Sequence, residues 1–373
     1  MFTAVRRALT VICSDQKSGN GGRILNLTAA LVCGIIRNKD CHLSHIADEM
    51  PGNALPASNE KRLHRLMKNK KFDLETYFLP FAQALLSCLS RETLVLAIDG
   101  STVGRGCMAL VVSVVYKQRA LPIAWLVVEG KKGHLPEAEH IKIIQQVHPL
   151  IPKGAKVVIV GDGEFDGINL QAVIKNWKWH YACRTASNIT LYWEDEPFVF
   201  QDMGDHTSPG EIFNAPGCKF TQKKYGPVLA LCWWRKDCKE PIYLVSNLSS
   251  AEEACHFYSK RFRIETFFSD AKSRGFNLHK SHISNPERIS RLMIGACLAY
   301  YWIVYLGAVA MNGSWWRKIR RSNRCDLSLF QLGLSLLKYF LKNGFDIPYR
   351  FWCLPETTSL SDGSNLCTHK RVR

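Results

Sequence analysis

The order of apolar segments between residues 94 and 188 constrains the fold of this chain more than any other feature. Strand-length runs rich in valine, isoleucine and leucine alternate there with stretches whose apolar residues recur at helical spacing. The first three strand-like runs are consecutive, and each of the next two follows a helix-like stretch. In chain order, the segments are strands 94–103, 107–118 and 119–130, helix 134–151, strand 156–165, helix 168–177 and strand 180–188.

This order, closed by a further helix around residue 265, is that of a ribonuclease H-like fold. We therefore predict an α/β protein whose core is a mixed sheet with helices, and in which the first and fourth strands are neighbours. Residues 190–248 break the alternation with short apolar runs separated by Pro, Gly, Asp and Asn, a pattern typical of β-strands. The core is thus expected to be interrupted by an all-β insertion.

Charge is distributed unevenly along the 373 residues, whose formal net charge is +17. Lysine and arginine outnumber aspartate and glutamate in residues 1–72 and 271–373, whereas residues 73–270 are nearly neutral. A neutral centre between basic ends suggests a unit held on a polyanion, with nucleic acid favoured over an anionic membrane. A solvated surface rich in lysine is the alternative.

The basic N-terminal part contains three expected short helices, at residues 27–38, 42–49 and 58–69. In the last of these, Arg62, Arg65 and Lys68 recur every three positions and predict a basic helix face. A helix-turn-helix-like DNA-binding domain and a plain helical cap both fit this pattern. The expected domains are a helical DNA-binding region (1–90), the first part of the core (91–189), the β-insertion (190–248), a core helix (249–285) and a helical, basic C-terminal region (286–373).

Fourteen cysteines are present, but no Cys-x2-Cys pair or zinc-ligand spacing occurs among them. Several lie in apolar runs, where cysteine behaves as a small hydrophobic residue. The N-terminal apolar stretch is interrupted too early for a secretory signal. We expect a reduced protein of the cytoplasm.

Residues 292–311 contain no charged side chain and are long enough to span a membrane. Tyr300, Tyr301, Trp302 and Tyr305 lie at the centre of this run, whereas membrane proteins place such residues at the ends. We therefore expect a helix buried in a large core beside the helix that carries Glu265, and no membrane partner.

Three acidic residues are placed for metal chemistry. Asp99 is expected to end the first strand, Asp162 ends the apolar run of the fourth, and Glu265 lies on the last core helix. With no cation expected between them, such carboxylates repel one another unless they share hard divalent cations. Two Mg²⁺ (or Mn²⁺) ions about 4 Å apart would then activate water or a 3′-hydroxyl for phosphoryl transfer.

Each acid also has a simpler explanation. An aspartate followed by glycine at the end of a strand is often a turn residue, and Glu265 could form a surface ion pair with Arg261, four residues earlier. Asp166 and Glu164 compete with Asp162 for the second position. We favour Asp162 because it directly follows the apolar run.

Glu265 belongs to a spaced polar set. Positions 258, 261, 265 and 272 advance by three, four and seven residues, which puts their side chains on one face of a single helix. A carboxylate, a phenol and two cations on one surface suggest contact with phosphates. The set consists of Tyr258, Arg261, Glu265 and Lys272.

These motifs resemble the DDE transposases of bacterial insertion sequences, and more narrowly the IS-four-type group. That group has the Tyr-Arg-Glu-Lys signature and a β-strand insertion before the glutamate, and the resemblance covers residues 40–285. It implies that Asp99, Asp162 and Glu265 bind divalent metals. It also implies that Tyr258, Arg261 and Lys272 contact DNA phosphates near the cleaved end.

The chain departs from this group directly after the signature arginine, where many relatives have tryptophan and this chain has Phe262. In the group, aromatic residues there and in the insertion help to hold a flipped base of a hairpin end. Phenylalanine can stack on a base with less area than indole. Tyr243 or the pair Trp233 and Trp234 could supply a second platform, or these aromatics could belong to the core.

The resemblance implies a cut-and-paste DNA transposase that acts as a homodimer on double-stranded DNA, namely the terminal inverted repeats and the target. It also implies a bacterial cytoplasmic protein associated with the nucleoid. Two other functions fit the same residues: a ribonuclease H-fold DNA nuclease without strand transfer, and a domesticated DNA-binding protein that has lost cleavage. The intact acids and Lys272 disfavour the second. Inverted repeats flanking the gene would separate a transposase from a nuclease.

Overall fold

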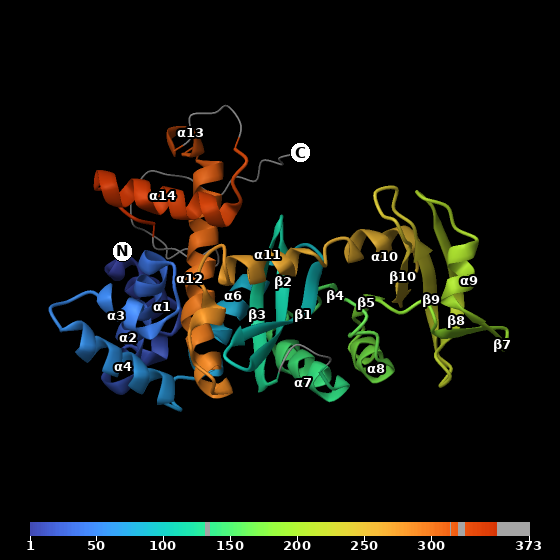
Figure 1. Cartoon of the computed structure of the whole chain (residues 1–373), viewed down its shortest axis with the longest axis horizontal. Helices are drawn as coiled ribbons and strands as arrows, with labels where there is room; N and C mark the ends of the chain where they lie inside the picture. The colour runs from blue at the N-terminus through green and yellow to red at the C-terminus, as the bar shows by residue number, and fades with distance from the viewer. Residues whose placement is uncertain (131–134, 314, 320–324, 349–373) are drawn as a thin grey trace.

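One sheet of ten strands organises the protein, for which we use a computed structural model that describes residues 1–130, 135–313, 315–319 and 325–348. Its strand order is β3-β2-β1-β4-β5-β10-β9-β8-β6-β7 (Figure 1). β1 and β4 pair in parallel, as do β4 and β5, and the other pairs are antiparallel. The core strands are β1 (Leu94–Gly104), β2 (Cys107–Tyr116), β3 (Arg119–Glu129), β4 (Val157–Gly161) and β5 (His180–Arg184).

The predicted ribonuclease H-like core is therefore present. Its first three strands form an antiparallel meander, and the fourth and fifth are added beside the first through helical connections. Strands β1 and β4 are neighbours, as expected. The connecting helices are α7 (Glu137–Val147), η2 (His148–Leu150) and α8 (Ile168–Asn176).

The insertion continues the core sheet because β10 pairs antiparallel with β5. It is not all-β as predicted, since residues 200–205 form a helix. Phe200 and Met203 are buried at helical spacing, and the Asp202 carboxylate accepts a hydrogen bond from the Val199 amide (2.8 Å), which caps the first turn. The elements are β6 (Thr190–Trp193), β7 (Glu196–Val199), α9 (Phe200–Asp205), β8 (Ile212–Phe220), β9 (Tyr225–Trp233) and β10 (Ile242–Ser246).

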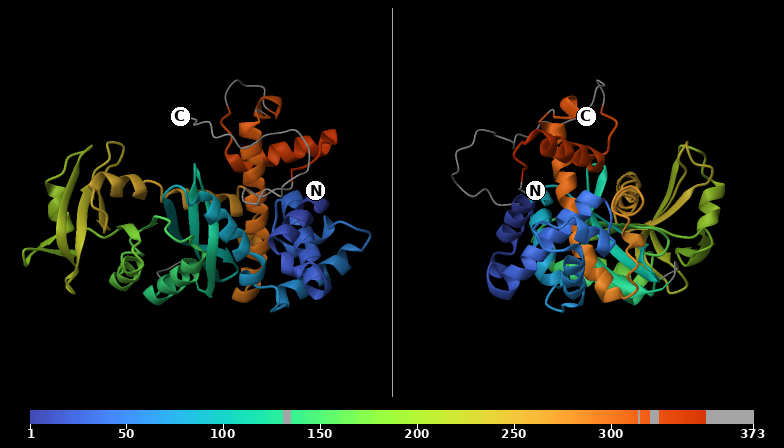
Figure 2. Two further views of the ribbon diagram at one scale, coloured as in Figure 1. Left: turned by 180° about the vertical axis from the view of Figure 1, so that it is seen from behind. Right: turned by 60° about the vertical axis from the view of Figure 1, so that its left-hand side comes forward.

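The N-terminal region is helical, and its helices up to residue 68 lie on the far side of α12 (Pro286–Asn312) from the sheet, whereas its last helix, residues 79–89, packs on β3 (Figures 1 and 2). The three helices predicted there exist, and further helices flank them. The described elements are α1 (Phe2–Ile12), η1 (Ser14–Gln16), α2 (Gly19–Asn38), α3 (Leu43–Asp48), α4 (Pro56–Lys68), α5 (Leu74–Tyr77) and α6 (Leu79–Leu89).

Helix α12 is long and apolar enough to cross a membrane, but 89% of its most apolar window is buried inside the protein. It packs on α2, β3 and α14 (Leu329–Asn343). The Tyr301 hydroxyl donates to the Pro122 carbonyl oxygen (2.6 Å), and the Trp302 indole N–H donates to the Pro348 carbonyl oxygen (3.1 Å). The prediction of a buried helix at 292–311 is thus correct.

The C-terminal basic region is only partly described. Helix α13 (Trp316–Ile319) carries Arg317, whereas the following arginines at 320, 321 and 324, and residues 349–373 of the predicted C-terminal domain, lie outside the described residues. The domain boundaries expected from the sequence stay predictions.

Candidate active site

The two aspartates lie at the same edge of the sheet. Parallel pairing of β1 with β4 ends at Ala97 and Val160, and each aspartate follows two residues later in the sequence. Asp162 directly follows β4, as predicted. Asp99 does not end its strand: β1 continues to Gly104 because its second half stays paired with β2 after it leaves β4.

Burial and like charge act together on Asp99, whose side chain is 19% exposed. They raise its pKa from 3.8 to about 6: burial has the largest effect, and the nearby Asp162 carboxylate adds to it. The Gly100 amide, which donates to Oδ1 at 2.7 Å, and Arg261 oppose the shift. The site thus holds a buried carboxyl group whose charged form needs a further cation.

The signature residues do not share one helix, which corrects the prediction for residues 249–285. Helix α10 (Ala251–Tyr258) ends at Tyr258, a tight turn contains Arg261, and α11 (Arg263–Ala271) carries Glu265 in its first turn. Lys272 is the residue directly after α11. The chain changes direction at this turn. The side chains of the signature residues nevertheless lie near the sheet edge that holds the aspartates.

Arg261 lies between the acids, contrary to the expectation that no cation would separate them. Its guanidinium is 3.2 Å from a Glu265 carboxylate oxygen and 3.8 Å from Asp99 Oδ2, and its side chain is 9% exposed. It also lies over the Phe262 ring, 4.2 Å from the centroid. The arginine therefore acts as an internal counter-ion in the protein without metal or DNA.

Lys272 and Tyr258 border the acids from two sides. The Lys272 ammonium donates to the hydroxyls of Ser101 (2.6 Å) and Thr102 (3.3 Å), which follow Asp99 on β1. Tyr258 is buried, and burial raises the pKa of its phenol, while Arg261 and Arg184 oppose the rise.

Arg184 is a basic residue of this edge that the sequence reasoning missed. It is the exposed last residue of β5, the strand that pairs in parallel with β4 through Gly161 and Cys183. It therefore follows the strand next to the one that ends at Asp162. The sequence prediction extended the fifth strand to residue 188 and so placed Arg184 inside it, whereas the structure ends β5 at Arg184, beside the end of β4.

Asp166 and Glu164, the rivals of Asp162, have partners within the fold. The Thr185 hydroxyl donates to Asp166 (2.6 Å), and burial raises the pKa of this carboxyl group. Glu164 accepts a hydrogen bond from the Leu135 amide (2.6 Å) and lies 3.4 Å from His140 Nε2. Both carboxylates therefore stabilise the loop after β4.

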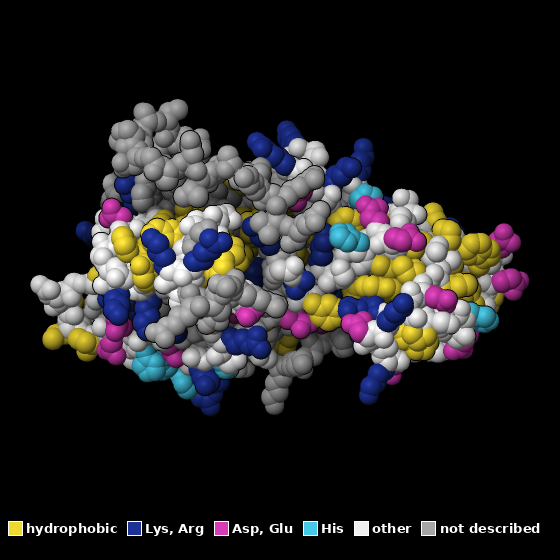
Figure 3. Space-filling model, turned by 90° about the horizontal axis from the view of Figure 1, so that it is seen from above, with side chains coloured by type: hydrophobic (Ala, Val, Ile, Leu, Met, Phe, Trp, Pro, Cys, Tyr) yellow, Lys and Arg dark blue, Asp and Glu magenta, His cyan; other side chains and the backbone are white. Residues whose placement is uncertain are grey.

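Phe262 is 42% exposed beside the acids. The other candidate platforms differ from it: Tyr243 is buried against Phe200 (centroids 5.8 Å apart), and Trp233 and Trp234 are half-buried. Hydrophobic side chains are also exposed at the end of the molecule formed by β6–β9, seen at the right of Figure 3. Trp193 and Phe213 belong to this region and are more than 40% exposed.

Comparison with known proteins gives the family. A family model described as "Transposase DDE domain" matches residues 90–302, more than half of the chain. The chain belongs to this family. It matches none of the curated proteins with which it was compared. Among solved structures, a cryo-EM structure of the piggyBac transposase synaptic complex with hairpin DNA has 12% sequence identity and a TM-score of 0.44, over 97% of this chain and 84% of that one.

Members of the DDE transposase family use divalent metal ions, so the acids can be tested for their fit to one. Among the described residues, no three His, Cys, Asp or Glu side chains form a group that could hold a metal. Asp99 and Asp162 fit a divalent cation, because neighbouring strands bring the two carboxylates to one sheet edge, where burial and then the charge of Asp162 raise the pKa of Asp99. Glu265 forms an ion pair with Arg261, and it would complete the set of metal ligands if that ion pair broke.

The basic residues of α4 lie elsewhere in this transposase. Arg62, Arg65 and Lys68 are exposed on α4, on the opposite side of α12 from the core sheet (Figure 1). Arg62 donates to the Asn59 side chain (3.1 Å), whose residue is buried. The α4 face is therefore free for a partner but is not part of the acidic edge.

Proposed function

We propose that this DNA transposase works by cut-and-paste: it hydrolyses a phosphodiester at each transposon end and joins the freed 3′-hydroxyl to target DNA. The observation that carries this proposal is the placement of Asp99 and Asp162 at one sheet edge, with Glu265 linked to Asp99 through Arg261, all within the segment that matches the family. The chemistry needs only positioning and charge stabilisation of a phosphoryl group, which this edge can supply.

We assign metal binding to Asp99, Asp162 and Glu265, and expect two Mg²⁺ or Mn²⁺ ions. Bound divalent cations supply an activated water or hydroxyl and stabilise the leaving oxygen. Arg261 neutralises Asp99 and Glu265 in the free protein. If the two carboxylates held a metal, the guanidinium would be available to a DNA phosphate, so that metal and substrate binding would support one another.

The narrower IS-four-type group is also a proposal. Its support is the Tyr-Arg-Glu-Lys spacing together with a strand-rich insertion between β5 and α10. Phe262, exposed next to Arg261, is the residue best placed to stack on a flipped base of a hairpin end.

Double-stranded DNA is the proposed partner, as transposon ends and as target. The net charge of +17 and the exposed basic face of α4 favour it. Each chain carries one set of acids, and two ends must be cut and joined together, so we propose a homodimer assembled on DNA.

The test is cleavage of terminal-repeat DNA in Mg²⁺ by three variants, Asp99→Ala, Asp162→Ala and Glu265→Ala. Each should lose cleavage by a factor of at least about 10³ while folding and DNA binding persist, because each removes a metal ligand and lessens repulsion among the acids. Asp166→Ala is the matched control on the same loop and should retain cleavage. If Asp162→Ala cuts and Asp166→Ala does not, the second ligand is misassigned.

A further inference from the structure

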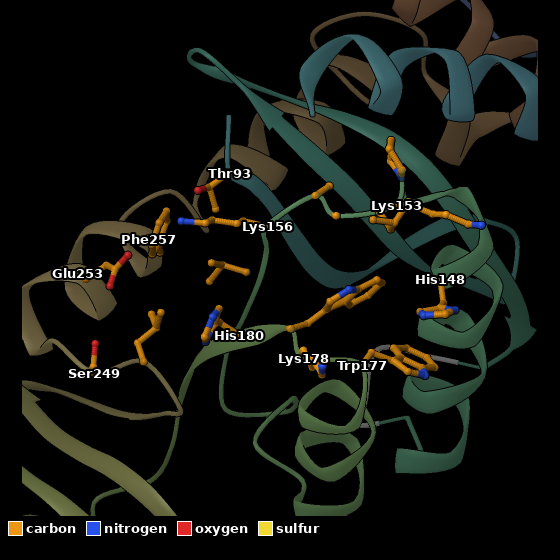
Figure 4. A pocket seen from close by; sticks show the side chains of 17 residues that line it. Thr93, His148, Lys153, Lys156, Trp177, Lys178, His180, Ser249, Glu253 and Phe257 are labelled. Carbon is orange, nitrogen blue, oxygen red and sulfur yellow. The ribbon is translucent and has the colours of Figure 1, made fainter. Parts of the chain in front are cut away.

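A pocket of about 660 Å³ lies at the opposite edge of the core sheet from the acids. It is formed where strands β1, β4 and β5 begin, with α10 on one side and η2 on the other (Figure 4). Lys156 precedes β4 and lines this pocket, whereas Asp162 follows the same strand. A strand of five residues spans about 17 Å, so the two sites are separated by roughly that distance.

The pocket is basic. Lys153, Lys156 and Lys178 come from the two segments that lead into β4 and β5, and all three are exposed. None of their ammonium groups has an ion-pair partner among the residues that the structure describes. Glu253 on α10 is the single carboxylate of the lining. Three uncompensated cations around one hollow attract an anion with several charges.

One wall of the pocket is a rigid aromatic group. The His148 ring stacks on Trp177 with centroids 4.1 Å apart, and Trp177 contacts Trp179 at 5.1 Å. Trp179 is buried in the core and fixes the group, whereas His148 is exposed. The imidazole can therefore add a hydrogen bond to the ligand that the lysines attract.

Among the described residues, the lining contains no arginine, asparagine or glutamine. Asparagine and glutamine read adenine, and arginine and lysine can read guanine in the major groove, but lysines on flexible stems also bind phosphates of any sequence as point charges. The pocket thus has the chemistry to hold a phosphodiester backbone without choosing a sequence. The proposed function has two DNA partners, the transposon ends and the target. The protein does not need to recognise the sequence of the target, so the target fits this pocket better.

We propose that this pocket is a second DNA site, which holds the backbone of target duplex through Lys153, Lys156, Lys178 and His148. The proposal rests on the proposed transposase function for the identity of the duplex. The distance between the pocket and the acids corresponds to about five base pairs at 3.4 Å each.

The test uses the full chain and a 30-base-pair duplex of arbitrary sequence. Lys153→Ala, Lys156→Ala and Lys178→Ala are combined, and the control combines Lys117→Ala, Lys142→Ala and Lys175→Ala, three exposed lysines outside the lining. In the pocket variant the slope of log affinity against log salt should flatten by about three, roughly one per phosphate contact, and affinity should fall by about an order of magnitude or more. The control should change neither by a comparable amount.

Two further arms identify the duplex. With pre-cleaved ends, strand transfer by the pocket variant should fall while cleavage of terminal-repeat DNA stays at the wild-type rate. Unchanged affinity and slope on the arbitrary duplex would overturn the proposal, and so would an equal loss of terminal-repeat cleavage, which would assign the pocket to the transposon end. If the wild-type protein cleaves no terminal repeat, the proposed function fails, and the binding arm still decides whether the pocket holds DNA.

Discussion

Arg261 shows how single side chains prepare this site for a ligand that the free protein lacks. The same guanidinium contacts Asp99 and Glu265, packs on Phe262 and is almost fully buried. Its buried Nε has no hydrogen-bond partner among the described atoms. Arg261 thus has an unsatisfied donor, and the acids beside it repel one another. A DNA phosphate would accept a hydrogen bond from the arginine, and a metal ion would offset the repulsion among the acids.

The raised pKa of Asp99 predicts a pH-dependent stability in buffer with a chelator. A native pKa of about 6 against 3.8 in the unfolded chain means that the native state binds the proton more tightly, so stability falls as pH rises from about 4 to about 6 and then levels off. Asp99→Asn removes this cost. Its free energy of unfolding should exceed that of the wild type by up to about 3 kcal/mol above pH 6, and the gain should vanish near pH 4.

Urea denaturation between pH 4.5 and 8 measures this difference. Millimolar Mg²⁺ at pH 7 serves as the control, since it should stabilise the wild type and leave Asp99→Asn unchanged. A stability difference that does not vary with pH would show that Asp99 titrates normally.

At the scale of elements, α11 is fixed to the sheet by a buried ion pair. The Arg119 guanidinium at the start of β3 donates to Asp270 near the end of α11 at 2.7 Å, and both side chains are at most 12% exposed. Burial nevertheless raises the pKa of Asp270 to about 6, in spite of Arg119. The pair thus acts mainly by fixing geometry, because desolvation offsets much of its attraction.

A single and a double variant test this function of the pair. Asp270→Ala should cost about 3–5 kcal/mol because it leaves a buried guanidinium without its carboxylate, whereas Arg119→Met with Asp270→Leu should recover most of that loss. The recovered protein should still cleave more slowly, since α11 also carries Glu265. Equal destabilisation by the single and double variants would show that the ion pair has no specific role.

Helix α4 has a separate prediction, because its basic face is exposed and far from the acids. Changing Arg62, Arg65 and Lys68 together to alanine should weaken binding to terminal-repeat DNA and flatten its salt dependence by about one unit per lost phosphate contact. Replacement of Lys117, Lys142 and Lys175 is a charge-matched control. An unchanged slope would leave α4 with a packing role and direct the search to the arginines after α12.

The strands could be predicted from sequence because apolar runs and their order determine them, and β1 to β5 lie where those runs do. The break between α10 and α11 could not. Residues 259–262 contain neither glycine nor proline, and the spacing of three and four that a helix requires is kept across the turn. The continuation of β1 past Asp99 depends on pairing with β2, which is a tertiary effect that no local pattern records.

At the scale of the whole molecule, the N-terminal helices and the C-terminal helices α13 and α14 gather around α12 at one end of the core sheet, and the insertion lies at the other end (Figure 1). Helices α12 and α14 approach so closely that a Cβ at Gly307 would lie 1.9 Å from the Leu329 carbonyl oxygen, and one at Gly333 would lie 1.9 Å from that of Ile303. Backbone contact of this kind allows little sliding. The C-terminal helices are thus rigidly connected to the core, and the spacing of basic surfaces around the acids is set by packing.

The last prediction concerns assembly. Two chains that each carry a net charge of +17 repel one another, and DNA removes that repulsion by neutralising both. The free protein should therefore be monomeric at low ionic strength, whereas addition of terminal-repeat duplex should give a complex of two chains and two duplexes. Light scattering on Asp99→Asn, which should leave the DNA uncut, measures this mass against 42.3 kDa per chain. Salt should dissolve the complex, because screening frees the DNA that holds it together. A mass of one chain per duplex at saturating DNA would contradict the dimer and require each end to be cut independently.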